Sequence, residues 1–287
     1  MTPADHDAHA APWTTVITPS RGWLDWRLRE LWRYRDLVAL FVWRDFTSVY
    51  KQTILGPLWH VIQPLLATLT FMGFGSVTGL STDGTPKFLF YLSGTVLWTY
   101  FAATLTQTSY ALVVNANLLG KVYFHRLVIP VSIALSNMIT FGIQFAIFLI
   151  ALGYYRLSGA DVHFTTWAFV TPLCLLILAG YGLGCGIIVA AMTTRYRDLG
   201  RLVTFGVQLF MFVTPVIYPL STVPAALQPI ARLNPLVPII EGCRKGFLGA
   251  GTVTPQDLTA SAGVMLVILV IGVMLFTHIE RTFADTV

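Results

Sequence analysis

Long apolar stretches without charged residues recur along this chain, and they predict helices that cross a lipid bilayer. A helix needs about 20 apolar residues to cross a hydrocarbon core of about 30 Å. Six stretches meet or approach this length, and none contains Asp, Glu, Lys or Arg. The pattern therefore predicts an all-α integral membrane protein with six transmembrane helices, over residues 54–78, 88–114, 128–152, 167–192, 202–218 and 258–278.

The composition agrees with this class. Charged residues make up 11% and hydrophobic residues 55% of the chain, whereas a soluble domain carries about 25% charged residues. Cys174 and Cys185 share one predicted span but lie about 16 Å apart along it, and Cys243 stands alone on the outer side. We therefore expect neither a disulfide framework nor a metal site.

The distribution of Lys and Arg predicts how the chain is oriented, because cytoplasmic loops carry an excess of these residues. With the N-terminus inside, thirteen lysines and arginines lie on the cytoplasmic side and five on the outer side. Both termini are therefore predicted to be cytoplasmic. The net charge of +5 reflects this topology and does not indicate nucleic-acid binding. The five outer residues are Lys87, Arg156, Arg232, Arg244 and Lys245.

Two segments precede the first predicted span. Residues 1–20 contain acidic residues and lack the apolar core of a signal peptide, so we expect a disordered cytoplasmic leader. Residues 21–35 place three leucines and Trp32 on one side of a helix, with charged residues opposite. This pattern predicts an amphipathic helix that lies on the inner leaflet, or one that packs on a partner protein. Residues 36–287 then form the six-span domain.

A bend is predicted where the chain enters the first span, at Leu55, Gly56 and Pro57. Proline removes a backbone donor and disfavours helix in the residue before it, and glycine adopts dihedral angles that other residues avoid. These three residues are therefore candidates for a hinge at the inner membrane face. The alternative is a simple helix start with proline in the first turn.

Two connecting segments also have distinctive patterns. The cytoplasmic loop 115–126 mixes apolar and basic residues, which predicts a short amphipathic helix or, alternatively, a solvated connector. The outer segment 219–257 contains two apolar pieces, 225–233 and 236–248, that are too short to cross the bilayer. We expect two re-entrant or surface-lying helices there.

The predicted spans lack the groups that an ion-driven transporter uses. Their only ionisable residues are His60 and His278, near the ends of the first and last spans. A phosphate-binding loop of the form GxxxxGK[ST] is also absent, so any ATP would be hydrolysed by a separate polypeptide. We expect the neutral polar residues of the spans to bond helices to one another or to contact cargo. The aromatic residues of the spans could fill the core, or they could offer faces on which sugar rings stack.

Three stretches resemble the type 2 ATP-binding-cassette (ABC) permeases that export bacterial O-antigen, teichoic acid or capsule. They are WRDFTSVYKQTILGPLWHVIQPL, YRDLGRLVTFGVQLFMFVTPVIYPLSTVP and LNPLVPIIEGCRKGFLG. The resemblance implies a homodimer in the cytoplasmic membrane, with two ATPase subunits that bind ATP and Mg²⁺. It further implies that a lipid-linked polysaccharide moves through a channel at the dimer interface, and that this chain itself holds no cofactor and is no enzyme.

The resemblance also assigns parts to segments of this chain. Residues 37–52 would form a gate helix that opens near Tyr50 when the hinge at Leu55, Gly56 and Pro57 moves, and residues 225–248 would form the outer gate. Residues 115–126 would be the coupling helix that seats in an ATPase groove, through Leu119, Lys121, Tyr123, Phe124, His125 and Arg126. The candidate channel lining is aromatic and consists of Tyr50, Trp59, Phe71, Phe74, Tyr91, Trp98, Phe101, Tyr110, Phe205, Phe212 and Tyr218.

Two other functions fit parts of the pattern. One is an ABC permease of similar architecture that exports a drug, a peptide or a lipid. The other is a membrane-embedded enzyme that modifies glycans, which the few acidic residues predicted on the outer side disfavour.

Overall fold

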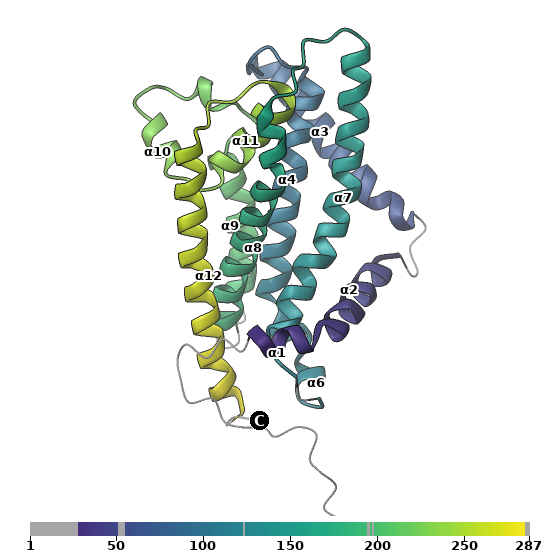
Figure 1. The fold of residues 1–287 in the computed structure, drawn as a ribbon, viewed down its shortest axis with the longest axis vertical. Coiled ribbons are helices and arrows are strands. Elements are labelled where there is room, and N and C mark those ends of the chain that lie inside the picture. The colour runs from purple at the N-terminus through teal and green to yellow at the C-terminus, as the bar shows by residue number, and fades with distance from the viewer. Residues whose placement is uncertain (1–27, 51–54, 123, 194–195, 197, 285–287) are drawn as a thin grey trace, which may run out of the picture.

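The computed structural model describes residues 28–50, 55–122, 124–193, 196 and 198–284, and every regular element in these ranges is a helix or a helical turn. The all-α prediction is confirmed. The expected leader, residues 1–20, lies outside the described residues. Within the described ranges, five spans are long and apolar enough to cross a membrane, and they run roughly side by side (Figure 1). They are α3 (Trp59–Thr78), α4 (Lys87–Ser109), α7 (Val128–Leu157), the turn η2 (Thr166–Val170) continued by α8 (Thr171–Thr193), and α12 (Pro255–Ala284).

The predicted fifth span contains a shorter helix, α9 (Leu199–Val213). Its 15 residues extend about 22 Å, which is less than the hydrocarbon core. The helix stops because Pro215 follows Thr214, and the residue before a proline favours the extended conformation that Thr214 adopts. A six-span topology therefore stays a prediction, in which α9 would need the non-helical residues after it to complete the crossing.

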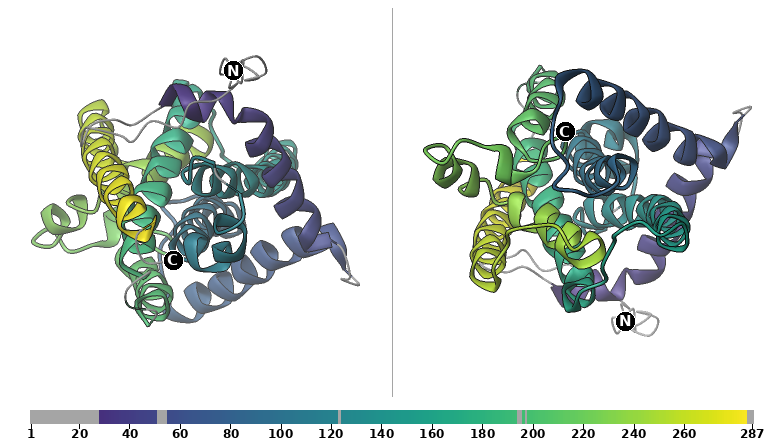
Figure 2. Two further views of the ribbon diagram at one scale, coloured as in Figure 1. Left: turned by 90° about the horizontal axis from the view of Figure 1, so that it is seen from below. Right: turned by 90° about the horizontal axis from the view of Figure 1, so that it is seen from above.

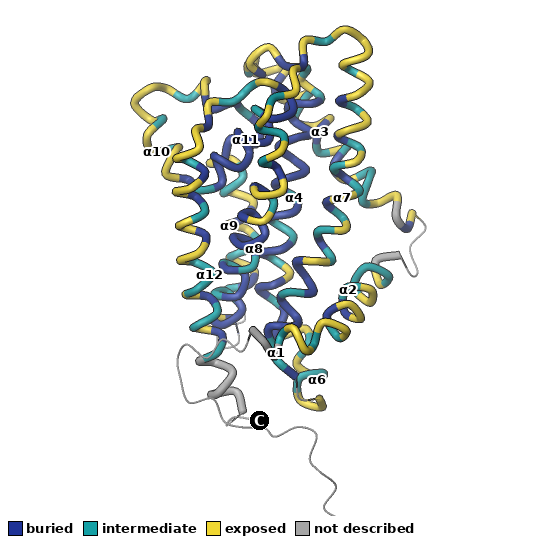
Figure 3. Tube along the Cα trace, in the orientation of Figure 1, coloured by how far each residue is buried: buried dark blue, intermediate teal, exposed yellow. Residues whose placement is uncertain are grey.

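The centre of the molecule is formed by α4 and α8. Most residues of these two spans are buried, whereas α3 and α12 bury few of theirs (Figure 3). Gly182 and Gly186 of α8 face α4, where a Cβ on Gly186 would lie 2.6 Å from the Cβ of Thr108. Gly184 faces α12, where a Cβ would lie 3.1 Å from the backbone of Leu269. Small residues spaced four apart thus let both neighbours approach α8 closely.

The end of the bundle that is predicted to be cytoplasmic carries, among the described residues, the helices α1 (Leu28–Arg33), α2 (Arg35–Tyr50), α5 (Ala111–Val114) and α6 (Ala116–Leu119). The described part of the expected interfacial helix is α1, which ends at Arg33 before α2 begins. Figure 2 shows α2 along the edge of the bundle, leading toward the start of α3. It packs against α7 and leads to the 3-10 turn η1 (Gly56–Leu58).

The opposite end of the bundle, which is predicted to face outward, holds the two short helices predicted between the last spans. They are α10 (Gln228–Arg232) and α11 (Val237–Leu248), preceded by the turn η3 (Leu220–Thr222). They differ in their surroundings. No residue of α10 is buried, whereas α11 is buried along almost its whole length and packs against η2, α8 and α4. The second helix therefore forms part of the core of the bundle.

Candidate functional site

Three of the candidate channel aromatics lie inside the protomer. Tyr91, Trp98 and Phe101 are 0%, 7% and 4% exposed. The Trp98 ring contacts the rings of Phe101 and Phe210 at centroid distances of 5.4 and 6.0 Å. These side chains fill the core between helices and have no outward face in this conformation.

Four other candidates are exposed on two neighbouring helices. Trp59 and Phe74 project from α3, and Phe205 and Phe212 project from α9, each about half exposed. Both helices pack against α4, and Figure 2 shows them along one side of the bundle. An exposed aromatic face of this kind can contact lipid, a second protomer or cargo.

The remaining candidates have different positions. Phe71 is partly buried against the core, and Tyr110 is half-buried where α4 ends. The Tyr218 hydroxyl donates to the backbone carbonyls of Phe212 and Val213, both at 3.2 Å, and so caps the C-terminus of α9. Tyr50 is the last residue of α2, and its side chain lies outside the described part of the chain.

The candidate hinge coincides with a change of element. Gly56 has a φ of +45°, and the turn η1 runs from it to Leu58 before α3 begins at Trp59. Leu55 is exposed, and its carbonyl accepts a hydrogen bond from the Leu58 amide at 2.9 Å. Pro57 lies within the turn. The conformation agrees with a bend at these residues, and movement about it stays a prediction.

Substitution of Gly56 by alanine should destabilise the protein, because a left-handed φ costs an L-residue about 1 kcal/mol. The matched control is Gly73→Ala, at an exposed position inside α3 where a Cβ meets nothing within 4 Å. That change should stabilise the helix by roughly 0.5–1 kcal/mol. Thermal unfolding of both variants in one detergent measures the effects, and equal shifts in the same direction would contradict the prediction.

The candidate coupling residues divide into an inward and an outward set. Phe124 is buried, and Leu119 is partly buried in the same cluster. Lys121 and its neighbour Val122 are exposed. The other candidates are His125 and Arg126, which are half-buried, and Tyr123, which lies outside the described residues.

The inward set joins the coupling segment to α2. The Phe41 ring of α2 meets the edge of the Phe124 ring at a centroid distance of 5.8 Å. Val38, Val128 and Ile133 complete the buried cluster around them. A displacement of the coupling segment would therefore be passed to α2 through packed side chains.

A buried arginine connects several segments at the end of the bundle that contains α11. Arg244 of α11 is 1% exposed, and its guanidinium donates to the carbonyls of Pro215 and Val216, both at 2.6 Å. It also pairs with Glu241 at 3.4 Å and lies over the Phe90 ring, 3.7 Å from the centroid. One side chain thus connects α11 to α4 and to the turn after α9.

Residues 36–248 match the family described as ABC-2 type transporter, which covers well over half of the chain. The chain belongs to this family. Its described helices therefore form a multi-pass membrane component of a transport system. The matched region includes the coupling segment, the candidate hinge and Arg244.

Several relatives with known names span almost the whole of this ABC-2 family chain. It is 29% identical to the O-antigen export system permease protein RfbA of Myxococcus xanthus, over 91% of this chain and 98% of that protein. It is 26% identical to the RfbA protein of Klebsiella pneumoniae, over 87% and 94% of the two chains. The polysialic acid transport protein KpsM of Escherichia coli is 22% identical over 85% and 93%. The resemblance drawn from the sequence is thereby confirmed at the level of the family.

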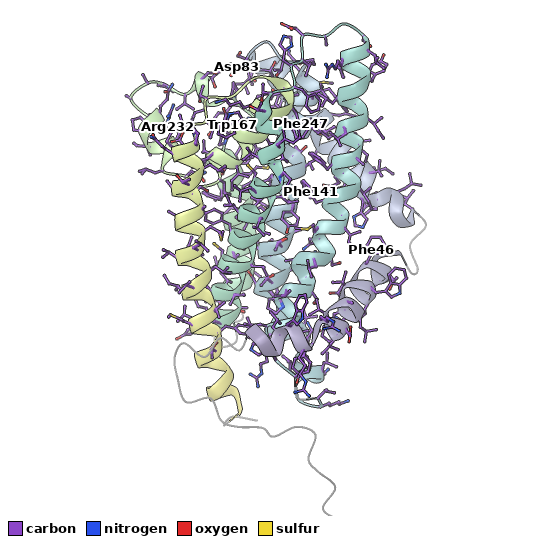
Figure 4. The ribbon with its side chains drawn as sticks, viewed as in Figure 1. Phe46, Asp83, Phe141, Trp167, Arg232 and Phe247 are labelled. Carbon is purple, nitrogen blue, oxygen red and sulfur yellow. The ribbon has the colours of Figure 1, made fainter. Side chains whose placement is uncertain are left out.

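The structure of this ABC-2 chain also shows an aromatic column that the sequence analysis missed. Phe141 and Phe145 of α7 stack at 5.4 Å, and Phe145 meets Phe247 of α11 at 5.5 Å. Phe148 and Phe164 also contact Phe247, and Figure 4 shows Phe141 and Phe247 inside the bundle. The spacing 141, 145, 148 is the helical signal that could have indicated this face. In the described ranges no group of His, Cys, Asp and Glu could hold a metal ion.

Proposed function

We propose that this chain is the transmembrane subunit of an ATP-driven exporter, which moves a lipid-linked cell-surface polysaccharide across the bacterial cytoplasmic membrane. The observation that carries the proposal is its similarity to named polysaccharide export permeases over almost their entire lengths. A match of this extent includes both ends of the bundle and is not confined to one motif. The similarity therefore supports a shared task as well as a shared fold.

The energy would come from two ATPase subunits on the cytoplasmic side, where ATP and Mg²⁺ bind. The exposed residues Lys121 and Val122 offer a contact for such a subunit, while Phe124 connects the same segment to α2. The orientation has both termini in the cytoplasm. In Figure 4, Asp83, Trp167 and Arg232 lie near the upper end of the molecule, and Phe46 of α2 lies below them, at about mid-height.

A homodimer would form the channel between two copies. The exposed aromatic faces of α3 and α9 are suited to line it, through Trp59, Phe74, Phe205 and Phe212. Each stacking contact with a sugar ring is weak, so a row of them can hold a polymer without trapping it. The buried Tyr91, Trp98 and Phe101 would support this lining from behind.

Purification of the chain with its ATPase tests the proposal directly. Lipid-linked glycan from the source cells should stimulate ATP hydrolysis by the reconstituted complex, and cells that lack the chain should retain the glycan on the inner leaflet. An active complex that does not respond to glycan but responds to drugs, peptides or phospholipids would instead support an exporter of those compounds.

Val122→Asp should weaken recovery of the ATPase at least about fivefold, because it places an uncompensated charge in the proposed contact. Leu157→Asp is the matched control, since Leu157 is also exposed but ends α7 at the outer side. Quantitative co-purification compares the two. Equal recovery from both variants would exclude this segment as the ATPase contact.

A further inference from the structure

A pocket whose lining includes an ion pair and several uncharged polar residues opens at the cytoplasmic end of the bundle, where α2 faces the end of α4, the short helix α5 and the first turns of α7. Its volume is about 360 Å³, which lies within the range of small-ligand sites. The pocket brings the charged residues Arg44 and Asp45 of α2 next to uncharged polar residues at the end of a predicted span. The lining residues are Arg44, Asp45, Thr106, Gln107, Tyr110, Ala111, Val114, Asn115 and Ile133.

One wall of the pocket is an ion pair on α2. The Nε and Nη2 atoms of Arg44 both bond to Oδ1 of Asp45, at 2.9 and 2.8 Å. Among the described residues, Oδ2 of Asp45 and the Nη1 atom of Arg44 take no part in this pair and can serve as an acceptor and a donor. The pair has no net charge, so the wall suits a neutral ligand with several hydroxyl groups better than it suits an anion.

The facing wall supplies an aromatic surface and an amide. Tyr110 lies against the first turn of α9, where a Cβ on Gly200 would be 2.5 Å from the Tyr110 ring. This close approach fixes the ring at the edge of the pocket. The Gln107 carbonyl accepts from the Asn137 amide at 3.1 Å, which holds the Gln107 side chain in place.

We propose that this pocket binds one neutral sugar ring of the glycan before it enters the channel. The ring's hydroxyl groups would bond to Asp45, Arg44 and Gln107, and its C–H face would pack on Tyr110. The pocket adjoins α2, which the Phe41–Phe124 contact ties to the coupling segment. Binding of a sugar in the pocket and movement of the coupling segment would therefore both act on α2. This inference rests on the proposed function and adds a cytoplasmic recognition site to it.

Binding to the full chain, reconstituted with its ATPase in nanodiscs, tests the site. The probes are the lipid-linked glycan from the source cells and the same glycan released from its lipid by mild acid. Asp45→Asn removes a charged acceptor and should weaken binding of both probes about tenfold. The matched control is Asp36→Asn on the exposed first turn of α2, which should bind as the wild type does.

Arg44→Gln separates a sugar site from an anion site. A sugar loses a hydrogen bond in either variant, so both should weaken binding of the released glycan. An anionic lipid phosphate would bind more tightly to Asp45→Asn and more weakly to Arg44→Gln, and this pattern would overturn the proposal. Unchanged binding in both variants, with thermal unfolding like that of the wild type, would also overturn it while leaving the proposed function intact. A wild-type complex that binds neither probe and exports no glycan would refute the proposed function itself.

Discussion

Replacement of Arg244 by methionine is expected to destabilise the protein by about 3–5 kcal/mol, a larger effect than that of any other change considered. Methionine has similar length but no charge. The variant therefore keeps most of the packing over Phe90 and loses the donors to Pro215 and Val216. Glu241 then remains buried without its cationic partner. The buried carbonyls lose their bonds as well, and a buried acceptor without a partner is costly.

Thermal unfolding in detergent and the monodispersity of the purified protein measure this effect. The matched control is Arg232→Met, because Arg232 belongs to the same outer segment but is exposed on α10. Its midpoint should stay close to that of the wild type. A similar midpoint for Arg244→Met would mean that the buried arginine contributes little to stability. Arg244→Lys should lie between the two, since a lysine can satisfy fewer carbonyls at once.

Gly186→Val is expected to destabilise the protein by about 1–3 kcal/mol through overpacking. A Cβ at this position would lie 2.6 Å from the Cβ of Thr108 and 3.0 Å from the backbone carbonyl of Leu105. Backbone cannot move as a flexible side chain can, so α4 and α8 would have to separate. Their separation would loosen the most buried part of the bundle.

Gly142→Val provides the comparison, because a Cβ at Gly142 of α7 meets nothing within 4 Å. Both variants place the same β-branched residue inside an apolar helix, so the cost in helix propensity is shared. Unfolding midpoints should therefore separate the packing effect from the propensity effect. If the two variants unfold at the same temperature, the close approach of α4 and α8 is not important for stability.

The number and class of the long helices could be predicted because a membrane imposes a length and excludes charge. That argument correctly located α3, α4, α7, α8 and α12. It extended the span of α9 to residue 218, because residues 202–218 carry no charge, whereas the helix ends before Pro215. A hydropathy profile depends on residue composition alone, so it does not show that the backbone stops being helical at the end of α9.

The aromatic residues could not be sorted into core and surface from the sequence. A helix that is buried on all sides, such as α4, has no polar face to show which residues point inward. Trp98 and Phe205 therefore look alike in sequence, although Trp98 is buried and Phe205 is exposed. The burial of a charged residue could not be predicted from the sequence either, as Arg244 shows. The topology count treated it as an outer loop residue, and only the fold of α11 into the bundle places it beside Glu241.

The helices differ in how closely they pack on their neighbours, and this difference predicts which parts of the bundle can move. Glycine contacts bind α8 closely to α4 and α12, whereas α3 buries few residues. The described hydrogen bonds from α3 to its neighbours include Thr68 with Thr95 at 3.1 Å and the His60 carbonyl with Gln144 at 3.3 Å. The α4–α8–α12 unit should therefore behave as a rigid frame, with α2 and α3 as an arm that pivots on it. Amide protons of the arm should exchange with solvent deuterium sooner than those of the frame.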